Sequence, residues 1–160
     1  MAIKSWTDYF LDMAKTCSSR SNCLRAQVGA VIVGPDKKIK ATGYNGTPSK
    51  VESCYERGSC FRIDNNIPSG TRYETCRAIH AEQNAIIQAG QDRCTGATMY
   101  IYGHNFICIL CKRFIVQSGI VDVYLKKDDN SEIIHVSVDE IRQELENPVP
   151  ENKCLSELTN

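Results

Sequence analysis

Four residues in two short motifs are able to bind a metal ion and activate water. Cys108 and Cys111 are three positions apart, and in a helix this spacing puts both side chains on one face. His80, earlier in the chain, offers a nitrogen ligand. Three nitrogen and sulfur ligands leave the fourth position of a tetrahedral Zn²⁺ open for water, which is the arrangement of a catalytic zinc site. Glu82 lies two residues after His80 and is able to take a proton from that water and return it to a leaving group.

Each motif also has a simpler interpretation when it occurs alone. A Cys-x-x-Cys that opens a helix in an α/β protein is at least as often a redox dithiol as a metal site. A single histidine is more often a packed or surface residue than a ligand. Two alternatives therefore stay open: a dithiol oxidoreductase that uses Cys108 and Cys111, and a zinc-stabilised binding module without activity. Neither gives Glu82 a role, so the combination favours zinc catalysis.

The pattern of apolar residues predicts the elements that position these motifs. We expect helices over about 5–18, 79–89, 108–118 and 137–146, and strands over 26–33, 38–44, 97–102, 120–125 and 132–136. The resulting order, α-β-β-α-β-α-β-β-α, is typical of an α/β layered domain. His80 and Cys108 then both lie at helix starts, where the helix dipole favours thiolates.

Length and charge limit the class of protein. The 160 residues suit one domain, which we place at 1–147, followed by a polar C-terminal tail at 148–160. No apolar run approaches the roughly 18 residues of a spanning helix, and the first residues do not resemble a signal peptide. We therefore expect a cytoplasmic protein without a membrane partner. Nineteen basic and nineteen acidic residues balance, which favours a small-molecule substrate over a nucleic acid polymer.

Several segments together resemble one known family. Residues 23–33 (CLRAQVGAVIV), 43–48 (GYNGTP), 80–86 (HAEQNAI) and 108–120 are similar to the deoxycytidylate (dCMP) deaminase branch of the cytidine deaminase superfamily. His-x-Glu followed by Cys-x-x-Cys is the zinc signature of these deaminases. The resemblance implies the cytidine deaminase-like three-layer α/β fold, a five-stranded mixed sheet flanked by helices.

The resemblance also implies an activity, the zinc-dependent hydrolytic deamination of dCMP to dUMP and ammonia. In this mechanism zinc-bound hydroxide attacks C4 of the pyrimidine, and Glu82 carries the proton to N3 and then to ammonia. Asn45 matches the asparagine that holds the sugar, its alternative being a turn residue beside glycine. Arg25 is the first candidate for the phosphate because arginine suits bidentate phosphate binding, and Lys112 and Arg113 follow. Relatives imply a homo-oligomer, often a hexamer, with dCTP and dTTP as allosteric effectors.

Two departures from the family pattern affect the substrate more than the chemistry. Ile107 stands where the family has proline before the first cysteine. Because proline fixes the backbone at a helix start, its replacement by isoleucine should loosen the entry to the helix. The connection over 100–108 is about two residues longer than usual and is expected beside the zinc. Other cytosine substrates, such as dCTP, a modified cytosine nucleotide, a nucleoside or tRNA, therefore stay open. His104 is interpreted as a polar loop residue near the site, and His135 as structural.

Four further cysteines suggest a second, structural zinc, which some relatives carry in this region. Cys54, Cys60 and Cys76 accompany a long loop over 45–74 that is rich in Gly, Pro, Ser and Asn, and Cys23 is the most plausible fourth ligand. A loop of this length inside a compact domain needs something to hold it. Four thiolates would fill a closed tetrahedral site. The alternative is that these are buried or free thiols.

Overall fold

The computed structural model describes residues 2–147, which form one mixed sheet with helices on both faces. The strands are β1 (Gly29–Val33), β2 (Ile39–Tyr44), β3 (Thr98–Tyr102), β4 (Asp122–Lys126) and β5 (Ile134–Ser137). The longer helices are α1 (Trp6–Ser18), α4 (Ala81–Ala89), α6 (Ile109–Ser118) and α7 (Val138–Glu146). Short helices α2 (Cys54–Arg57), α3 (Phe61–Asp64) and α5 (Gln91–Cys94) and a 3₁₀ turn at Tyr73–Thr75 were not predicted. The order of the longer elements confirms the prediction, and the predicted tail at 148–160 lies outside the described residues.

The strand order is β2-β1-β3-β4-β5. β3 and β4 are parallel, and every other neighbouring pair is antiparallel, so the predicted five-stranded mixed sheet is confirmed. The first strand starts later than predicted, at Gly29 rather than at Ala26. Before Gly29 the Asn45 side chain takes part in the pairing instead: its Oδ1 accepts from the Val28 N–H and its Nδ2 donates to the Ala26 carbonyl, while the Val28 carbonyl accepts from the Asn45 backbone N–H.

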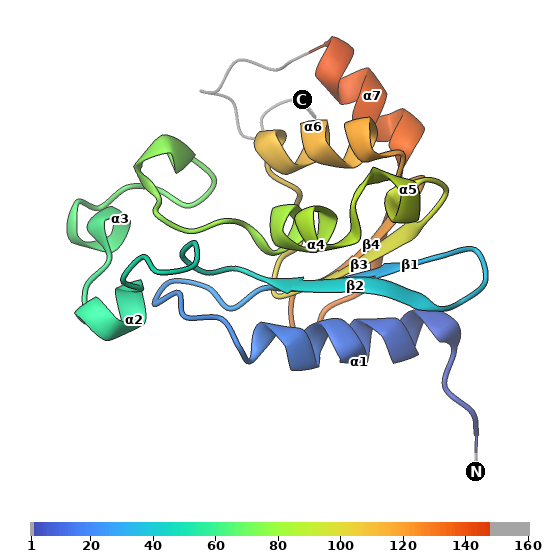
Figure 1. Cartoon of the computed structure of the whole chain (residues 1–160), viewed down its shortest axis with the longest axis horizontal. Coiled ribbons are helices and arrows are strands. Elements are labelled where there is room, and N and C mark those ends of the chain that lie inside the picture. The colour runs from blue at the N-terminus through green and yellow to red at the C-terminus, as the bar shows by residue number, and fades with distance from the viewer. Residues whose placement is uncertain (1, 148–160) are drawn as a thin grey trace.

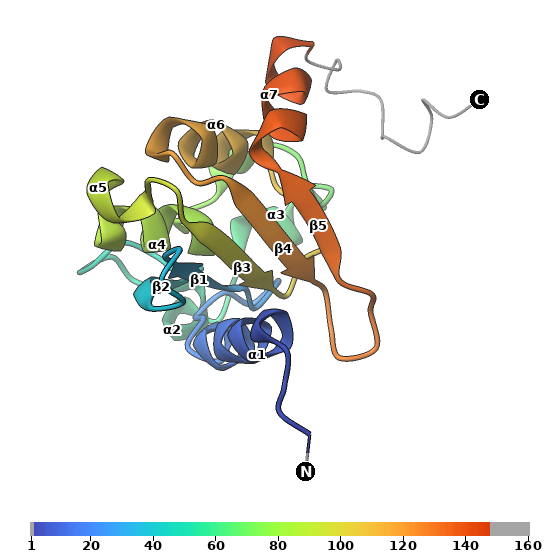
Figure 2. The ribbon, with the colours of Figure 1, turned by 90° about the vertical axis from the view of Figure 1, so that its right-hand side faces the viewer.

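Figure 1 shows the sheet nearly edge-on, with α1 covering one face and α4, α6 and α7 on the other. Figure 2 shows β3, β4 and β5 side by side, with α1 below them. Every residue of β1 is buried, so both faces of this strand are covered. Successive side chains of a strand point to opposite faces of the sheet. Val31 and Val33 join the core under α1, and Ala30 and Ile32 join the larger core under α4 and α6.

The first turn of α4 lies close against β2 because residue 43 is glycine. A Cβ atom at Gly43 would lie 2.3 Å from the carbonyl oxygen of Ala81, so any side chain there would push the helix away. This close approach brings the start of α4, with His80 and Glu82, next to the end of β2, where Asn45 follows. Gly43 thereby places the His80 and Glu82 motif next to Asn45 at one end of β2.

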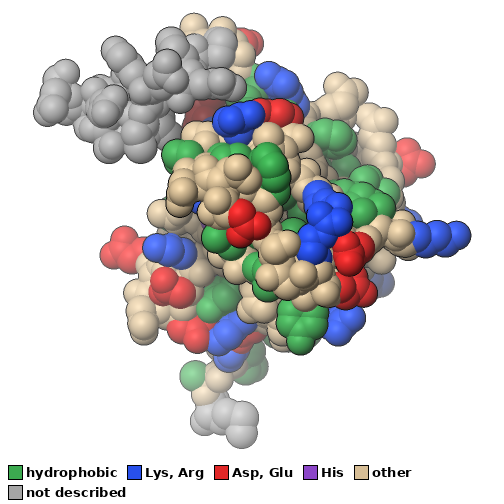
Figure 3. Space-filling view, turned by 90° about the vertical axis from the view of Figure 1, so that its left-hand side faces the viewer, with side chains coloured by type: hydrophobic (Ala, Val, Ile, Leu, Met, Phe, Trp, Pro, Cys, Tyr) green, Lys and Arg blue, Asp and Glu red, His purple; other side chains and the backbone are tan. Residues whose placement is uncertain are grey.

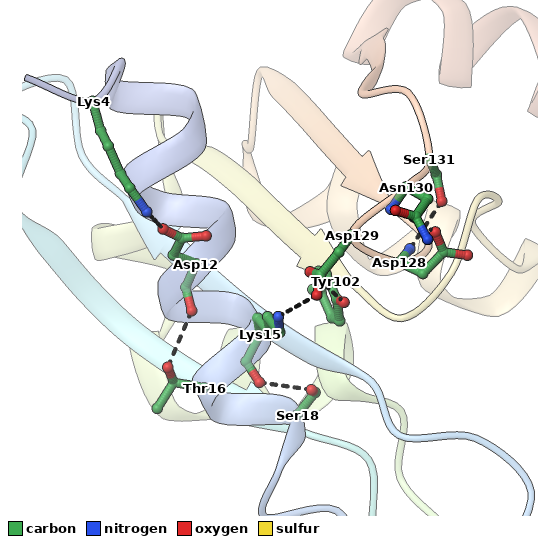
Figure 4. A network of polar contacts seen from close by, with 10 residues as sticks. All are labelled: Lys4, Asp12, Lys15, Thr16, Ser18, Tyr102, Asp128, Asp129, Asn130 and Ser131. Atoms are coloured by element: carbon green, nitrogen blue, oxygen red, sulfur yellow. Dashed lines mark hydrogen bonds and ion pairs between the residues drawn. The ribbon is translucent and has the colours of Figure 1, made fainter. Parts of the chain in front are cut away.

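A surface network ties α1 to the connection between β4 and β5 (Figure 4). Lys15 Nζ lies 2.6 Å from Asp129 Oδ2, and the Tyr102 hydroxyl donates to Asp129 at 3.0 Å. Exposed ion pairs of this kind contribute little to stability, about 0–1 kcal/mol. Tyr102 is nevertheless the last residue of β3, so the network anchors the point from which the chain leaves toward Cys108.

Within residues 2–147, none of the helices has both the length and the apolar character that crossing a membrane requires.

Candidate zinc site and its pocket

The structure brings the three expected ligands together. His80 is the N-cap residue of α4, Cys108 is the N-cap residue of α6, and Cys111 lies in the first turn of α6. His80 Nδ1 is 3.3 Å from Cys108 Sγ and 3.4 Å from Cys111 Sγ. In the described part of the chain these residues are the only group of three potential ligands whose ligand atoms all lie within 4.8 Å of one another. One nitrogen and two sulfurs in this arrangement suit a tetrahedral Zn²⁺ with one open position.

Local backbone geometry explains how two helix starts form one site. His80 and Cys108 both have extended N-cap conformations, with φ/ψ of −72°/156° and −69°/155°. Cys108 Sγ also accepts a hydrogen bond from the Cys111 N–H at 3.4 Å, which holds the first turn of α6. Ile107, where the family has proline, is buried in the core, and α6 begins directly after Cys108.

The two thiols differ in acidity. A hydrogen bond with Cys111 and one with His80 lower the pKa of Cys108 to about 4, although burial opposes this effect. The pKa of Cys111 is raised, first by its hydrogen bond with Cys108 and then by burial. The Cys108 thiolate is thus ready to bind a cation, and Cys111 would lose its proton on metal binding.

Glu82 lies beside the ligands without being one of them. Its side chain is 4% exposed, in the first turn of α4, and it lines the same pocket as His80 and Cys108. Burial raises the pKa of the Glu82 carboxyl above its ordinary value. A carboxyl of raised pKa inside a pocket is suited to take up a proton and release it again.

The pocket has a volume of about 470 Å³, which is in the range of small-molecule sites. One wall is the connection between β3 and α6, including His104, Asn105 and Phe106. The sequence prediction that this longer connection lies beside the zinc ligands is therefore confirmed. The rings of His104 and Phe106 pack together at 4.9 Å, and burial lowers the pKa of His104.

Asn45 lines this pocket and also joins two parts of its wall. Its side chain is 8% exposed; Oδ1 accepts from the Val28 N–H and Nδ2 donates to the Ala26 carbonyl, both at 2.8 Å. An amide side chain has two donors and two acceptor sites, so one of each stays available for a ligand. Asn45 thus has a structural role that the turn interpretation did not include.

Asn45→Ala is expected to lower the free energy of unfolding by about 1–3 kcal/mol, because it leaves the buried Val28 N–H without a partner. Urea denaturation of the variant and of Asn130→Ala, an exposed asparagine, measures the difference. An unchanged midpoint for Asn45→Ala would contradict the structural role.

Among the three phosphate candidates, only Arg25 lines the pocket. Its Nη1 donates to the Ile67 carbonyl at 2.7 Å. Lys112 instead forms an ion pair with Glu144 of α7, and Arg113 does not contribute to the wall.

Arg62 and Tyr73 are among the wall residues that sequence reasoning missed. The Tyr73 ring packs edge-on against His80 with a centroid distance of 4.7 Å. Burial raises the pKa of Tyr73 to about 12, so its phenol stays protonated near neutral pH. The only sign of Arg62 in the sequence was its position between two apolar residues, Phe61 and Ile63, in a loop with few other apolar residues.

The expected second site has four cysteines, and three of them act on the fourth, Cys54. Burial raises the pKa of the Cys54 thiol; charge at Cys60 and Cys23, a hydrogen bond with Cys60 and charge at Cys76 raise it further. The Cys23 sulfur also accepts a hydrogen bond from the Arg25 N–H at 3.4 Å. No three of these sulfurs approach one another as closely as the ligands around His80, as far as residues 2–147 are concerned. None of these four cysteines forms a disulfide within residues 2–147.

A five-stranded mixed sheet with a His-Cys-Cys site beside a glutamate is typical of zinc-dependent deaminase domains. The family model described as the cytidine and deoxycytidylate deaminase zinc-binding region matches residues 4–127. The chain therefore belongs to this family.

Relatives and solved structures agree with this assignment. The deoxycytidylate deaminases of Schizosaccharomyces pombe and Saccharomyces cerevisiae are each 40% identical over 119 residues, which is 74% of this chain and 36% of each relative. This chain thus spans little more than a third of those two proteins. The deoxycytidylate deaminase of Mycobacterium phage D29 is 35% identical over 133 residues, 80% of this chain and 99% of the relative. The dCMP deaminase of cyanophage S-TIM5, solved with dCMP and dUMP, has a TM-score of 0.58 and 26% identity, covering 89% of this chain and 94% of that chain.

Proposed function

We propose that this protein is a zinc-dependent deaminase that hydrolyses dCMP to dUMP and ammonia. The observation that carries the proposal is the buried Glu82 carboxyl in the same pocket as the three potential zinc ligands. The names of the relatives support dCMP in particular, since the phage D29 protein is a deoxycytidylate deaminase of nearly the same extent. The S-TIM5 structure with dCMP and dUMP gives further support.

Each residue then has a distinct part in the reaction. His80, Cys108 and Cys111 would hold the zinc ion, which when bound lowers the pKa of a water molecule and makes it nucleophilic near neutral pH. Glu82 accepts a proton from the water, delivers it to N3 and passes a proton to the departing amine. One water is consumed, the bond from C4 to the amino nitrogen breaks, and a carbonyl oxygen replaces the amine.

The other residues of the pocket would select the substrate. Asn45 is proposed to hold the sugar with its remaining donor and acceptor, and Arg25 to contact the phosphate. Figure 3 looks onto the side of the molecule that carries α2 and α3, where acidic and basic side chains are interspersed. This mixture supports a small nucleotide rather than a nucleic acid polymer, which usually binds a continuous basic surface.

A substrate comparison tests the proposal. The purified chain is given dCMP, CMP, dCTP, deoxycytidine and cytidine separately, and uracil products are followed by chromatography. We expect dCMP to be converted with the highest kcat/KM. Conversion of none of the five would overturn the proposed function, and preference for another of them would replace dCMP as the substrate.

We also propose that the protein is cytoplasmic and forms a homo-oligomer, a hexamer in the simplest case, with dCTP and dTTP as effectors. Free thiols at all eight described cysteines suit a reducing compartment. Light scattering in the presence and absence of either nucleotide tests the assembly, and adding each nucleotide to the dCMP assay tests regulation. A monomer whose activity is unaffected by both would contradict the two proposals.

A second zinc held by Cys23, Cys54, Cys60 and Cys76 is the structural part of the proposal. The support is that these thiols gather around Cys54, although more loosely than a filled site requires. Protein purified without added zinc is expected to contain two zinc ions per chain, and Cys54→Ser to contain one. One zinc in the unaltered chain would show that the four cysteines are free thiols.

A further inference from the structure

We propose that Arg62 binds the phosphate of the substrate, together with Arg25, in the pocket that also holds the zinc ligands. The inference rests on the proposed deaminase function and names the residue that distinguishes a nucleotide from a nucleoside. Arg62 lies in the short helix α3 and lines the same pocket as His80 and Glu82.

Arg62 is held rigidly by uncharged groups. Its side chain is 6% exposed, and Nη2 donates to the carbonyl oxygens of Pro68 at 3.1 Å and Thr71 at 2.6 Å. The guanidinium lies over the ring of Tyr73, 4.9 Å from its centroid. These contacts fix the orientation of the guanidinium, but none of them neutralises its charge.

The charge of Arg62 lacks a counter-ion within the described residues. No carboxylate forms an ion pair with Arg62 or Arg25 there. Nε of Arg62 is also the only buried side-chain nitrogen or oxygen in residues 2–147 without a hydrogen-bond partner. A buried charge is costly unless it is paired. An anionic ligand in the pocket would supply the missing charge.

Arg25 reaches the same loop from the segment that precedes β1. Its Nη1 donates to the Ile67 carbonyl, next to the Pro68 carbonyl that Arg62 contacts. One loop therefore positions both guanidinium groups, and both line the pocket. Arginine pairs bind phosphate oxygens through strong, geometrically defined hydrogen bonds, so two fixed guanidiniums suit a terminal phosphate group.

Tyr73 contacts both Arg62 and the potential zinc ligand His80. One part of its ring faces the guanidinium of Arg62, and the ring packs edge-on against His80. A substrate whose reacting base lies at His80 and Glu82 would therefore extend past Tyr73 to place an anionic group at the arginines. A nucleoside monophosphate has this shape, with the base at one end and the phosphate at the other.

The test compares dCMP with deoxycytidine, which differ only by the phosphate. Steady-state kinetics are measured for the zinc-loaded full chain and for Arg62→Gln, Arg62→Lys and Arg57→Gln. We expect Arg62→Gln to lose about 10- to 100-fold in kcat/KM for dCMP, the effect of losing charge-assisted hydrogen bonds, with little change for deoxycytidine. Arg62→Lys should recover part of the loss. Arg57 is the control because it is exposed and paired with Glu52 outside the pocket.

The outcomes separate this inference from the proposed function. An equal loss for both substrates would make Arg62 a structural support of its loop and overturn the inference, while the deaminase function would stand. Should the unaltered chain convert neither substrate, calorimetric binding of dUMP and deoxyuridine decides. Loss of dUMP binding in Arg62→Gln would then support the phosphate subsite without the reaction, and unchanged binding would overturn it. If Arg62→Gln does not fold, Arg62→Lys is measured in its place.

Discussion

Replacing Glu82 with glutamine is expected to lower kcat for dCMP by about 10²- to 10⁴-fold, the usual contribution of a positioned acid–base group. Glutamine has nearly the same size and fits the same buried position at the start of α4. It can still form hydrogen bonds, but it cannot take a proton from water and give it to the amine. The zinc content should stay at the unaltered level, because Glu82 is outside the group of ligand atoms.

Product chromatography and metal analysis on the same preparation test both parts of this expectation. Glu74→Gln is the matched control, since Glu74 is an exposed glutamate in the neighbouring loop. A Glu82→Gln variant with unaltered kcat would remove Glu82 from the mechanism. A variant that loses its zinc would show that Glu82 supports the metal instead.

Cys111→Ser is expected to remove the zinc and, with it, all measurable deaminase activity. Cys111 is fully buried, and its sulfur lies 3.4 Å from His80 Nδ1. Changing a partner of a metal ligand already costs about 10- to 100-fold in metal affinity, so the loss of a ligand itself should cost more. Zinc affinity is measured by competition with a chelator, and activity by conversion of dCMP.

Cys17→Ser provides the control, because Cys17 lies on α1 and outside the pocket wall. Unchanged zinc affinity in Cys111→Ser would contradict the ligand assignment. The dithiol alternative would be favoured if the unaltered chain contained no metal and formed a reversible disulfide between Cys108 and Cys111. In that case Glu82→Gln would leave the redox activity of the dithiol unaffected.

The long elements were predictable because their signals are local. The capping box at Ser137 and Glu140 begins the predicted helix over 137–146, and the left-handed Gly119 ends the one over 108–118, through contacts within a few residues. The short helices α2, α3 and α5 were missed because four-residue helices have little periodicity of their own. The early start predicted for β1 was wrong for a different reason: Asn45, distant in sequence, binds the backbone before Gly29.

The residues of the candidate site also differ in how far the local sequence identifies them. His80, Glu82, Cys108 and Cys111 could be named from their types and spacing, because two helix starts present their side chains in a direction that the local backbone determines. The roles of Asn45 and Arg25 stay predictions, but the structure adds that Asn45 also supports the wall. Lys112 followed Arg25 among the phosphate candidates because it is also a cation, yet its ammonium group pairs with Glu144 on α7.

The sequence by itself identified the three potential zinc ligands, the glutamate beside them and the deaminase family, since metal and acid–base chemistry depend on which atoms are present at a helix start. Tertiary structure alone decided which cations face the pocket. Arg62 comes to the wall because the loop from Ile67 to Thr71 folds over it and binds it through backbone carbonyls, and such contacts leave no mark in the identities of the residues that make them.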